Sequence, residues 1–234
     1  MKPAQVADFY ARLADRTPDP QTELESVNDY TLLVAVVLSA QATDAGVNLA
    51  TRHLFDMVTT PAAMVALGEE ALRERIKTIG LFNTKAKNVI ALSQALIDRY
   101  GGEVPADRDA LEALPGVGRK TANVVMNTAF GAETFAVDTH VFRVGNRTGL
   151  ALGKTPLEVE TRLDQVTPAP YRRDAHHLLI LHGRYVCKAR KPECWRCVVA
   201  DLCRYKPKTP PPGTAPAAIR KGKAADAARA GQKG

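Results

Sequence analysis

The chain has 234 residues, of which 45% are hydrophobic and only 6% aromatic, and it carries a formal net charge of +7. This length suits one large domain or two small ones with a mainly aliphatic core, and the charge favours an anionic partner. The longest apolar run, residues 31–40, is too short to span a bilayer, and residues 1–10 lack the apolar stretch of a secretory signal. We therefore expect a cytoplasmic protein without a membrane segment.

Helix start and stop signals recur along the chain, whereas the alternation typical of strands does not. The expected helix starts lie at or beside Asn28, Thr43, Thr60, Glu69, Asn83, Asp107, Arg119, Asp138, Thr155 and Arg173. Several of the expected helices stop at a glycine, as at Gly68, Gly101 and Gly131. The pattern predicts an all-α fold with about ten helices.

Positive charge is concentrated in the last quarter of the chain. Residues 182–206 carry a local charge of +5, and residues 207–234 carry another +5. The second segment is rich in proline, alanine, glycine and lysine without apolar periodicity, so it cannot bury enough surface to fold. We predict that 207–234 is a disordered basic tail.

Residues 114–122 read LPGVGRKTA, a glycine turn followed at once by Lys120. A phosphate-binding P-loop is excluded because Arg119, and not glycine, precedes the lysine. A dinucleotide-binding fingerprint is excluded because the third small residue is missing and a helical pattern, not a strand, precedes the turn. The segment is therefore predicted to be a helix, a short hairpin and a second helix.

All four cysteines fall within 17 residues, at Cys187, Cys194, Cys197 and Cys203. The spacing C-x6-C-x2-C-x5-C favours an iron–sulfur cluster bound by four thiolates. A structural zinc site is the second possibility, although such sites more often use two short cysteine pairs. Disulfides are the least favoured interpretation for a cytoplasmic protein.

The residues between the first two cysteines include Lys188, Arg190 and Lys191. A run of charge is often only a solvated loop. A loop tied at both ends to a metal centre would instead hold these cations rigidly, which suits contact with phosphates. We expect these three residues to face nucleic acid.

Taken together, these motifs resemble the endonuclease III family, the helix-hairpin-helix DNA glycosylases of base-excision repair. The resemblance rests on LPGVGRKTA, on VDTHVFR with its Asp138, on SAQATD and IKTIGLFNTKAKN, and on the cysteine spacing. It implies two helical lobes with a DNA-binding cleft between them, formed by residues 22–132 and by residues 1–21 plus 133–206. It also implies a [4Fe–4S] cluster on the four cysteines.

The resemblance implies catalytic roles for two residues. Lys120 would be the amine nucleophile that attacks the sugar, and Asp138 would be its acidic partner. Only a neutral amine can attack, and both burial in a cleft and the positive end of a helix disfavour the ammonium form. The implied activity is removal of oxidised pyrimidines from damaged double-stranded DNA by a monomer, followed by strand cleavage through a lysine imine.

The remaining implied roles concern the grip on DNA. A glycosylase must take its base out of the stack, and the space left behind must be filled. Gln41 would occupy that space, Ile79 and Leu81 would wedge near the lesion, and Gly116 and Gly118 would hold the hairpin on a phosphate.

Two alternatives remain open. An adenine-mismatch glycosylase shares the cysteine spacing, but that group usually lacks the lysine and carries a further C-terminal domain. A non-catalytic helix-hairpin-helix module that only binds DNA would need neither Lys120 nor Asp138.

Overall fold

The computed structural model describes residues 1–214, and within them the chain is helical without any strand, which confirms the all-α prediction. Residues 215–234, most of the predicted basic tail, lie outside the described part. The helices are α1 (Pro3–Arg16), α2 (Asp29–Leu38), α3 (Asp44–Phe55), α4 (Pro61–Leu67), α5 (Glu69–Ile76), α6 (Phe82–Tyr100), α7 (Arg108–Glu112), α8 (Arg119–Phe130), α9 (Thr139–Thr148), α10 (Pro156–Val166) and α11 (Ala175–Tyr185), with short 3-10 helices at Ala169–Tyr171 and Cys194–Arg196.

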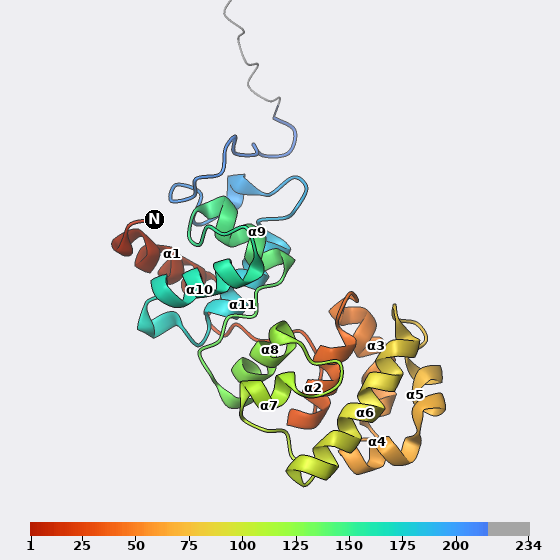
Figure 1. The fold of residues 1–234 in the computed structure, drawn as a ribbon. Helices are drawn as coiled ribbons and strands as arrows, with labels where there is room; N and C mark the ends of the chain where they lie inside the picture. Colours follow the sequence, from red (N-terminus) through yellow and green to blue (C-terminus); the bar gives the residue numbers. More distant parts are fainter. Residues whose placement is uncertain (215–234) are drawn as a thin grey trace, which may run out of the picture.

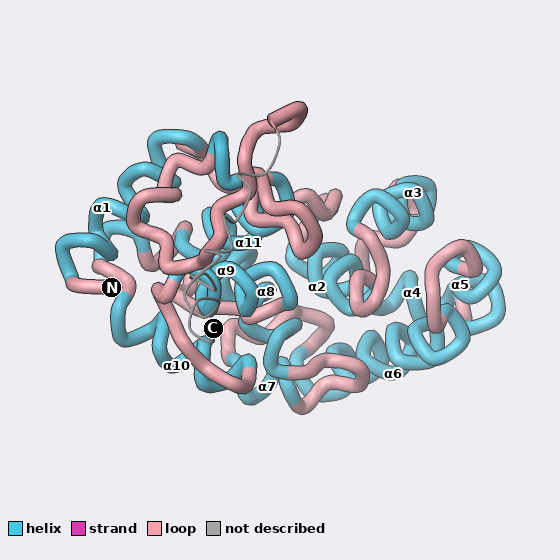
Figure 2. The backbone as a smooth tube through the Cα atoms, turned by 90° about the horizontal axis from the view of Figure 1, so that it is seen from above, coloured by secondary structure: helices cyan, strands magenta, loops and turns pink. Residues whose placement is uncertain are grey.

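The helices gather around two hydrophobic cores, which lie side by side in Figure 1. The central lobe consists of α2–α8, and α2 is its axis because residues 30–38 of this helix are all buried. The cluster lobe consists of α1, α9, α10, α11 and the cysteine segment 187–203. Figure 2 shows the same separation from above.

Helix α1 was missing from the sequence prediction. It begins at Pro3 and buries one face, formed by Val6, Phe9, Tyr10 and Leu13, in the cluster lobe. These residues recur at the spacing of a helix that packs on one side. The Tyr10 hydroxyl also lies 3.0 Å from the Thr167 hydroxyl in the core. The N-terminal helix therefore belongs with the C-terminal half of the chain.

Polar contacts join the two lobes at α8 and α10. The Arg119 guanidinium donates to both oxygens of Glu160, at distances of 2.8–3.2 Å. The Asn123 amide donates to the same carboxylate at 3.1 Å and to the Phe135 carbonyl at 3.2 Å. A bidentate ion pair of this kind fixes the orientation of α8 relative to α10 as well as the distance between them.

No helix within residues 1–214 is both long and apolar enough to cross a membrane.

We predict that Leu33→Ala lowers the free energy of unfolding by about 2–5 kcal/mol, because Leu33 is fully buried in α2 and its loss leaves a cavity. Leu49→Ala in α3 is the matched control, since Leu49 is 69% exposed and should change stability by less than about 0.5 kcal/mol. Urea denaturation followed by circular dichroism measures both. Equal losses from the two variants would contradict the assignment of α2 as the core of its lobe.

Candidate functional site

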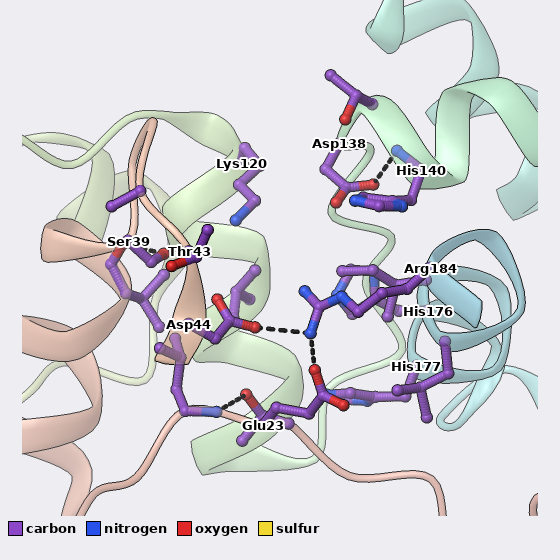
Figure 3. A pocket seen from close by; sticks show the side chains of 18 of the residues that line it. Glu23, Ser39, Thr43, Asp44, Lys120, Asp138, His140, His176, His177 and Arg184 are labelled. Carbon is purple, nitrogen blue, oxygen red and sulfur yellow. Dashed lines mark hydrogen bonds and ion pairs between the residues drawn. The ribbon is translucent and has the colours of Figure 1, made fainter. Parts of the chain in front are cut away.

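A cleft of about 660 Å³ opens between the two lobes. The central lobe contributes Asp44 and Lys120 to its walls, and the cluster lobe contributes Asp138, His140 and Arg184. Figure 3 shows these side chains facing one another across the opening. The structure thus brings together Lys120 and Asp138, which the sequence resemblance paired.

Lys120 is the second residue of α8, which begins with Arg119 directly after the N-cap glycine Gly118. Its side chain points from the α8 wall toward Asp44 in Figure 3. The expected burial of Lys120 is wrong for the free protein, because the residue is exposed at the cleft. Exclusion of water from Lys120 therefore has to come from a bound partner.

Asp138 is the N-cap of α9, as the sequence predicted. One carboxylate oxygen, Oδ1, accepts from the backbone N–H groups of His140 and Val141, both at 2.8 Å. These two bonds fix the carboxylate at the cleft wall. The electrostatic role of the residue is therefore compatible with its structural role as a cap.

The sequence interpretation missed a charged cluster in the same cleft. Arg184 of α11 forms ion pairs with Asp44 of α3, at 2.8 Å, and with Glu23 of the segment before α2. Tyr185 also donates to Glu23. In the sequence, Asp44 is only an acid in a first helical turn, and its pairing with Arg184 bridges the two lobes.

Burial raises the pKa of the Asp44 carboxyl. The Lys120 cation has the next largest effect and lowers this pKa, whereas the charge of Asp138 raises it. Asp44 is thus electrostatically coupled to Lys120 and Asp138, the two residues to which the resemblance assigns catalytic roles.

Two histidines line the back of the cleft. His176 and His177 of α11 pack edge to face with their ring centres 5.0 Å apart. Burial lowers the pKa of His176 well below its usual range, and His177 and Lys120 lower it further. His176 Nδ1 has no hydrogen-bond partner within the described residues. Both histidines are buried, which fits a structural role, and they also form a neutral wall of the cleft.

Two turns have strained backbones, one at Gln41, which lines the cleft, and one at Leu81. Gln41 has φ 55° and Leu81 has φ 60°, in the left-handed region that side chains rarely adopt. Both residues are exposed, Leu81 by 58%. Ile79 differs, because it is 5% exposed and packs into the central lobe beneath Leu81. Of the two expected wedges, only Leu81 therefore presents its side chain to a partner.

The hairpin needs a glycine at one of its two positions. Gly116 has φ +77°, and a Cβ there would lie 2.9 Å from the side chain of Asn88 on α6. Gly118 has φ −104°, and a Cβ there would meet open space. Gly116 thus fits the turn closely against α6, while Gly118 is free to begin α8 with its backbone N–H groups exposed.

All four cysteines line one small pocket in the cluster lobe, and none forms a disulfide. Four thiols around one pocket are the ligand set of an iron–sulfur cluster bound by four thiolates. Burial raises the pKa of Cys197 to about 11, so a thiolate there needs the positive charge that iron supplies.

Two arginines of α9 anchor the loop between the first two cysteines. Arg143 donates to the Cys187 carbonyl at 2.9 Å, and Arg147 donates to the carbonyls of Lys188 and Ala189 at 2.7 and 2.8 Å. Arg147 also lies over the Tyr205 ring, 4.7 Å from its centre. The protein itself therefore holds the loop at one end, in addition to any bond through the cysteines.

The loop cations differ in their availability. Lys188 pairs with Glu193 at 2.6 Å, and Arg196 pairs with the same carboxylate. Arg190 and Lys191 are exposed, and within residues 1–214 neither has an ion-pair partner. These two cations are the better placed of the three to contact phosphate.

Comparison with known proteins places the chain among repair enzymes. Residues 34–169 match the family described as HhH-GPD superfamily base excision DNA repair protein, and residues 187–203 match the iron–sulfur binding domain of endonuclease III. The chain is 56% identical over 208 residues to endonuclease III of Escherichia coli K12, covering 89% of this chain and 99% of that protein. It is 55% identical, with the same coverage, to endonuclease III of Haemophilus influenzae.

Solved structures show the same likeness in three dimensions. A non-covalent endonuclease III–DNA complex superposes with a TM-score of 0.82 at 47% identity, covering 87% of this chain and 96% of that chain. A trapped endonuclease III–DNA covalent intermediate superposes with a TM-score of 0.82 at 46% identity and the same coverage.

We predict that Gly116→Ala destabilises the protein by about 1–3 kcal/mol, because alanine is strained at φ +77° and its Cβ would collide with Asn88. Gly118→Ala is the matched control, which should be nearly neutral. Denaturant titration compares the two. A Gly118 variant that loses as much stability as the Gly116 variant would refute the assignment of the turn.

We predict that Cys197→Ser lowers the bound iron and the visible absorption of the purified protein, because serine replaces one of four thiolates. Iron analysis and protease sensitivity of residues 187–203 measure the effect. The native protein purified with zinc and without iron would overturn the identification of the pocket.

Proposed function

This chain belongs to the endonuclease III family of base-excision-repair DNA glycosylases with lyase activity, and from that premise we propose that it removes oxidised pyrimidines from duplex DNA through an imine on Lys120. The observation that carries the proposal is the cleft in which Lys120 and Asp138 face each other from different lobes. The cofactor is the family's [4Fe–4S] cluster, which ties the cysteine segment together through iron–thiolate bonds.

Lys120 performs the covalent step in this proposal. Its neutral Nζ attacks C1′ of the damaged nucleotide, and the bond from C1′ to the base breaks with its electron pair on the base. Opening of the sugar ring gives an imine, which makes the C2′ proton acidic. Loss of that proton expels the 3′ phosphate and cleaves the strand.

Asp138 stabilises positive charge on the sugar as the base departs. The two backbone N–H groups that hold its Oδ1 keep the carboxylate facing the cleft. Oriented charge of this kind costs no reorganisation when the reaction occurs.

The remaining predicted contacts form a DNA-binding edge. The hairpin at Gly116 and Gly118 offers backbone N–H groups to a phosphate without reading sequence. Leu81 and Gln41 project from strained turns and fill the space of the extruded nucleotide, with Ile79 as packing support. The cations of the cysteine loop hold the flanking backbone.

We further propose the setting in which the enzyme acts. The two cores support a division into residues 22–132 and residues 1–21 plus 133–206, which hold the DNA between them. The enzyme works as a monomer on damaged duplex DNA in the cytoplasm, where it associates with the nucleoid. DNA complexes of similar enzymes support the choice of partner.

An adenine-mismatch glycosylase is the weaker candidate for the activity. Such an enzyme needs no amine nucleophile, whereas Lys120 here points into the cleft beside two carboxylates. The close likeness to endonuclease III over most of the chain also favours the lyase.

We predict that borohydride traps a covalent protein–DNA adduct with the native protein and not with Lys120→Gln, because only an imine is reduced to a stable amine. Duplexes that contain one oxidised pyrimidine or one abasic site serve as substrates, and gel electrophoresis measures the yield. Lys154→Gln removes an exposed lysine outside the cleft and should trap normally. An undiminished yield from Lys120→Gln would assign the nucleophile to another amine.

A further inference from the structure

Asp44 occupies a position in the cleft that the proposed reaction does not use. It is the first residue of α3, next to the N-cap Thr43, and its side chain is only 21% exposed. In Figure 3 its carboxylate lies between the tip of Lys120 and the guanidinium of Arg184. A half-buried acid at this place faces the amine that must lose a proton before it can react.

Charged and titratable groups face Asp44 from every element around it. Lys120 approaches from α8, and Asp138 and His140 act from α9. Arg184 of α11 binds Asp44 Oδ2 at 2.8 Å and also pairs with Glu23. Burial raises the pKa of Asp44, and the Lys120 cation lowers it. Burial therefore makes the Asp44 carboxylate a better proton acceptor than an exposed acid, and the Lys120 cation opposes this effect.

Asp138 is the cap of α9, and its Oδ1 accepts from two backbone N–H groups while its Oδ2 accepts no hydrogen bond within residues 1–214. The choice of Asp44 rests on its place beside the tip of Lys120 in Figure 3. Asp44 Oδ2 is held by Arg184, but within residues 1–214 no donor binds its other oxygen, Oδ1. One carboxylate oxygen of Asp44 is thus free to take up and release a proton.

We propose that Asp44 is a further catalytic residue, which transfers a proton from Lys120 to the departing base; the proposal rests on Lys120 being the nucleophile. The Asp44 carboxylate accepts one proton from the Lys120 ammonium, which leaves a neutral amine. The amine then forms the bond to C1′ as the bond from C1′ to the base breaks. The base leaves with the electron pair and takes the proton from Asp44, so the carboxylate is regenerated.

Arg184 acts as a positioning residue in this scheme. Its ion pair with Asp44 crosses from the cluster lobe to the central lobe, and its second partner Glu23 shares the charge. The pair holds the Asp44 carboxylate in the cleft and leaves Oδ1 toward Lys120.

The test compares single-turnover base release by the native holoenzyme and by Asp44→Asn across pH 6 to 9, on duplex DNA with one oxidised pyrimidine. We expect the variant to be slower by about 100-fold or more at neutral pH, as is typical when a general acid–base group is removed. The deficit should shrink as pH rises, because hydroxide replaces the missing proton acceptor. Affinity for the same duplex should change little.

Two further variants keep the test decisive. Asp29→Asn removes an exposed acid from the first turn of α2 outside the cleft, and should leave the rate unchanged. Arg184→Gln breaks the ion pair but keeps the Asp44 carboxylate, so its deficit should not shrink with rising pH in the manner of Asp44→Asn. A pH-independent deficit shared by Asp44→Asn and Arg184→Gln, or no deficit in Asp44→Asn, overturns the proposal.

This outcome can be told apart from a failure of the proposed function. If Asp44 has only a structural role, borohydride trapping by native protein still requires Lys120. If the nucleophile is another amine, Lys120→Gln traps normally whatever Asp44→Asn does.

Discussion

The N-terminal ends of three helices open onto one cleft, and the chemistry of the protein depends on that convergence. Helix α8 presents Lys120, α9 presents Asp138 and α3 presents Asp44. Each helix start carries a partial positive charge, which favours carboxylates and disfavours an ammonium. The same field attracts the phosphates of a DNA backbone. A single geometric arrangement therefore suits both the proposed use of Lys120 as a nucleophile and the binding of a polyanionic substrate.

Two lobes supply these helix starts, because α3 and α8 belong to the central lobe and α9 belongs to the cluster lobe. The hairpin at Gly116 and the Arg119–Glu160 pair fix α8 at the boundary between the lobes. Arg184 fixes the opposite wall against Asp44. The cysteine segment contributes at a distance, because Arg143 and Arg147 connect its backbone to α9, the helix that begins with Asp138.

The sequence predicted those structural features that depend on contacts between neighbouring residues. Thr43, Thr60 and Asp138 cap helices as expected, since capping is a contact over two or three residues. The start of α6 was less predictable: it begins at Phe82 after the left-handed Leu81, and not at the polar pair that follows. Propensity alone does not anticipate a strained residue that the surrounding structure imposes.

Contacts between segments far apart in the chain could not be predicted from local sequence patterns. The pairing of Asp44 with Arg184 joins residues that no spacing rule connects, and an acid in a first helical turn has an ordinary explanation. Ile79 and Leu81 look alike in sequence, but only the fold buries one and exposes the other. Helix α1 did carry a readable signal in its apolar spacing and in Pro3, and its omission was an error of interpretation rather than a limit of the sequence.

The packing of α1 against α11 has a consequence for biosynthesis. The core of the central lobe is built almost entirely from one continuous stretch of chain, so it can form while the ribosome is still translating the rest. The cluster lobe cannot, because α1 packs against α11, which begins 159 residues after the end of α1 (from 16 to 175). Its closure pairs segments far apart in the chain, and contacts of this kind form slowly. The four cysteines belong to this lobe, so their pocket is complete only after the last helices have been synthesised.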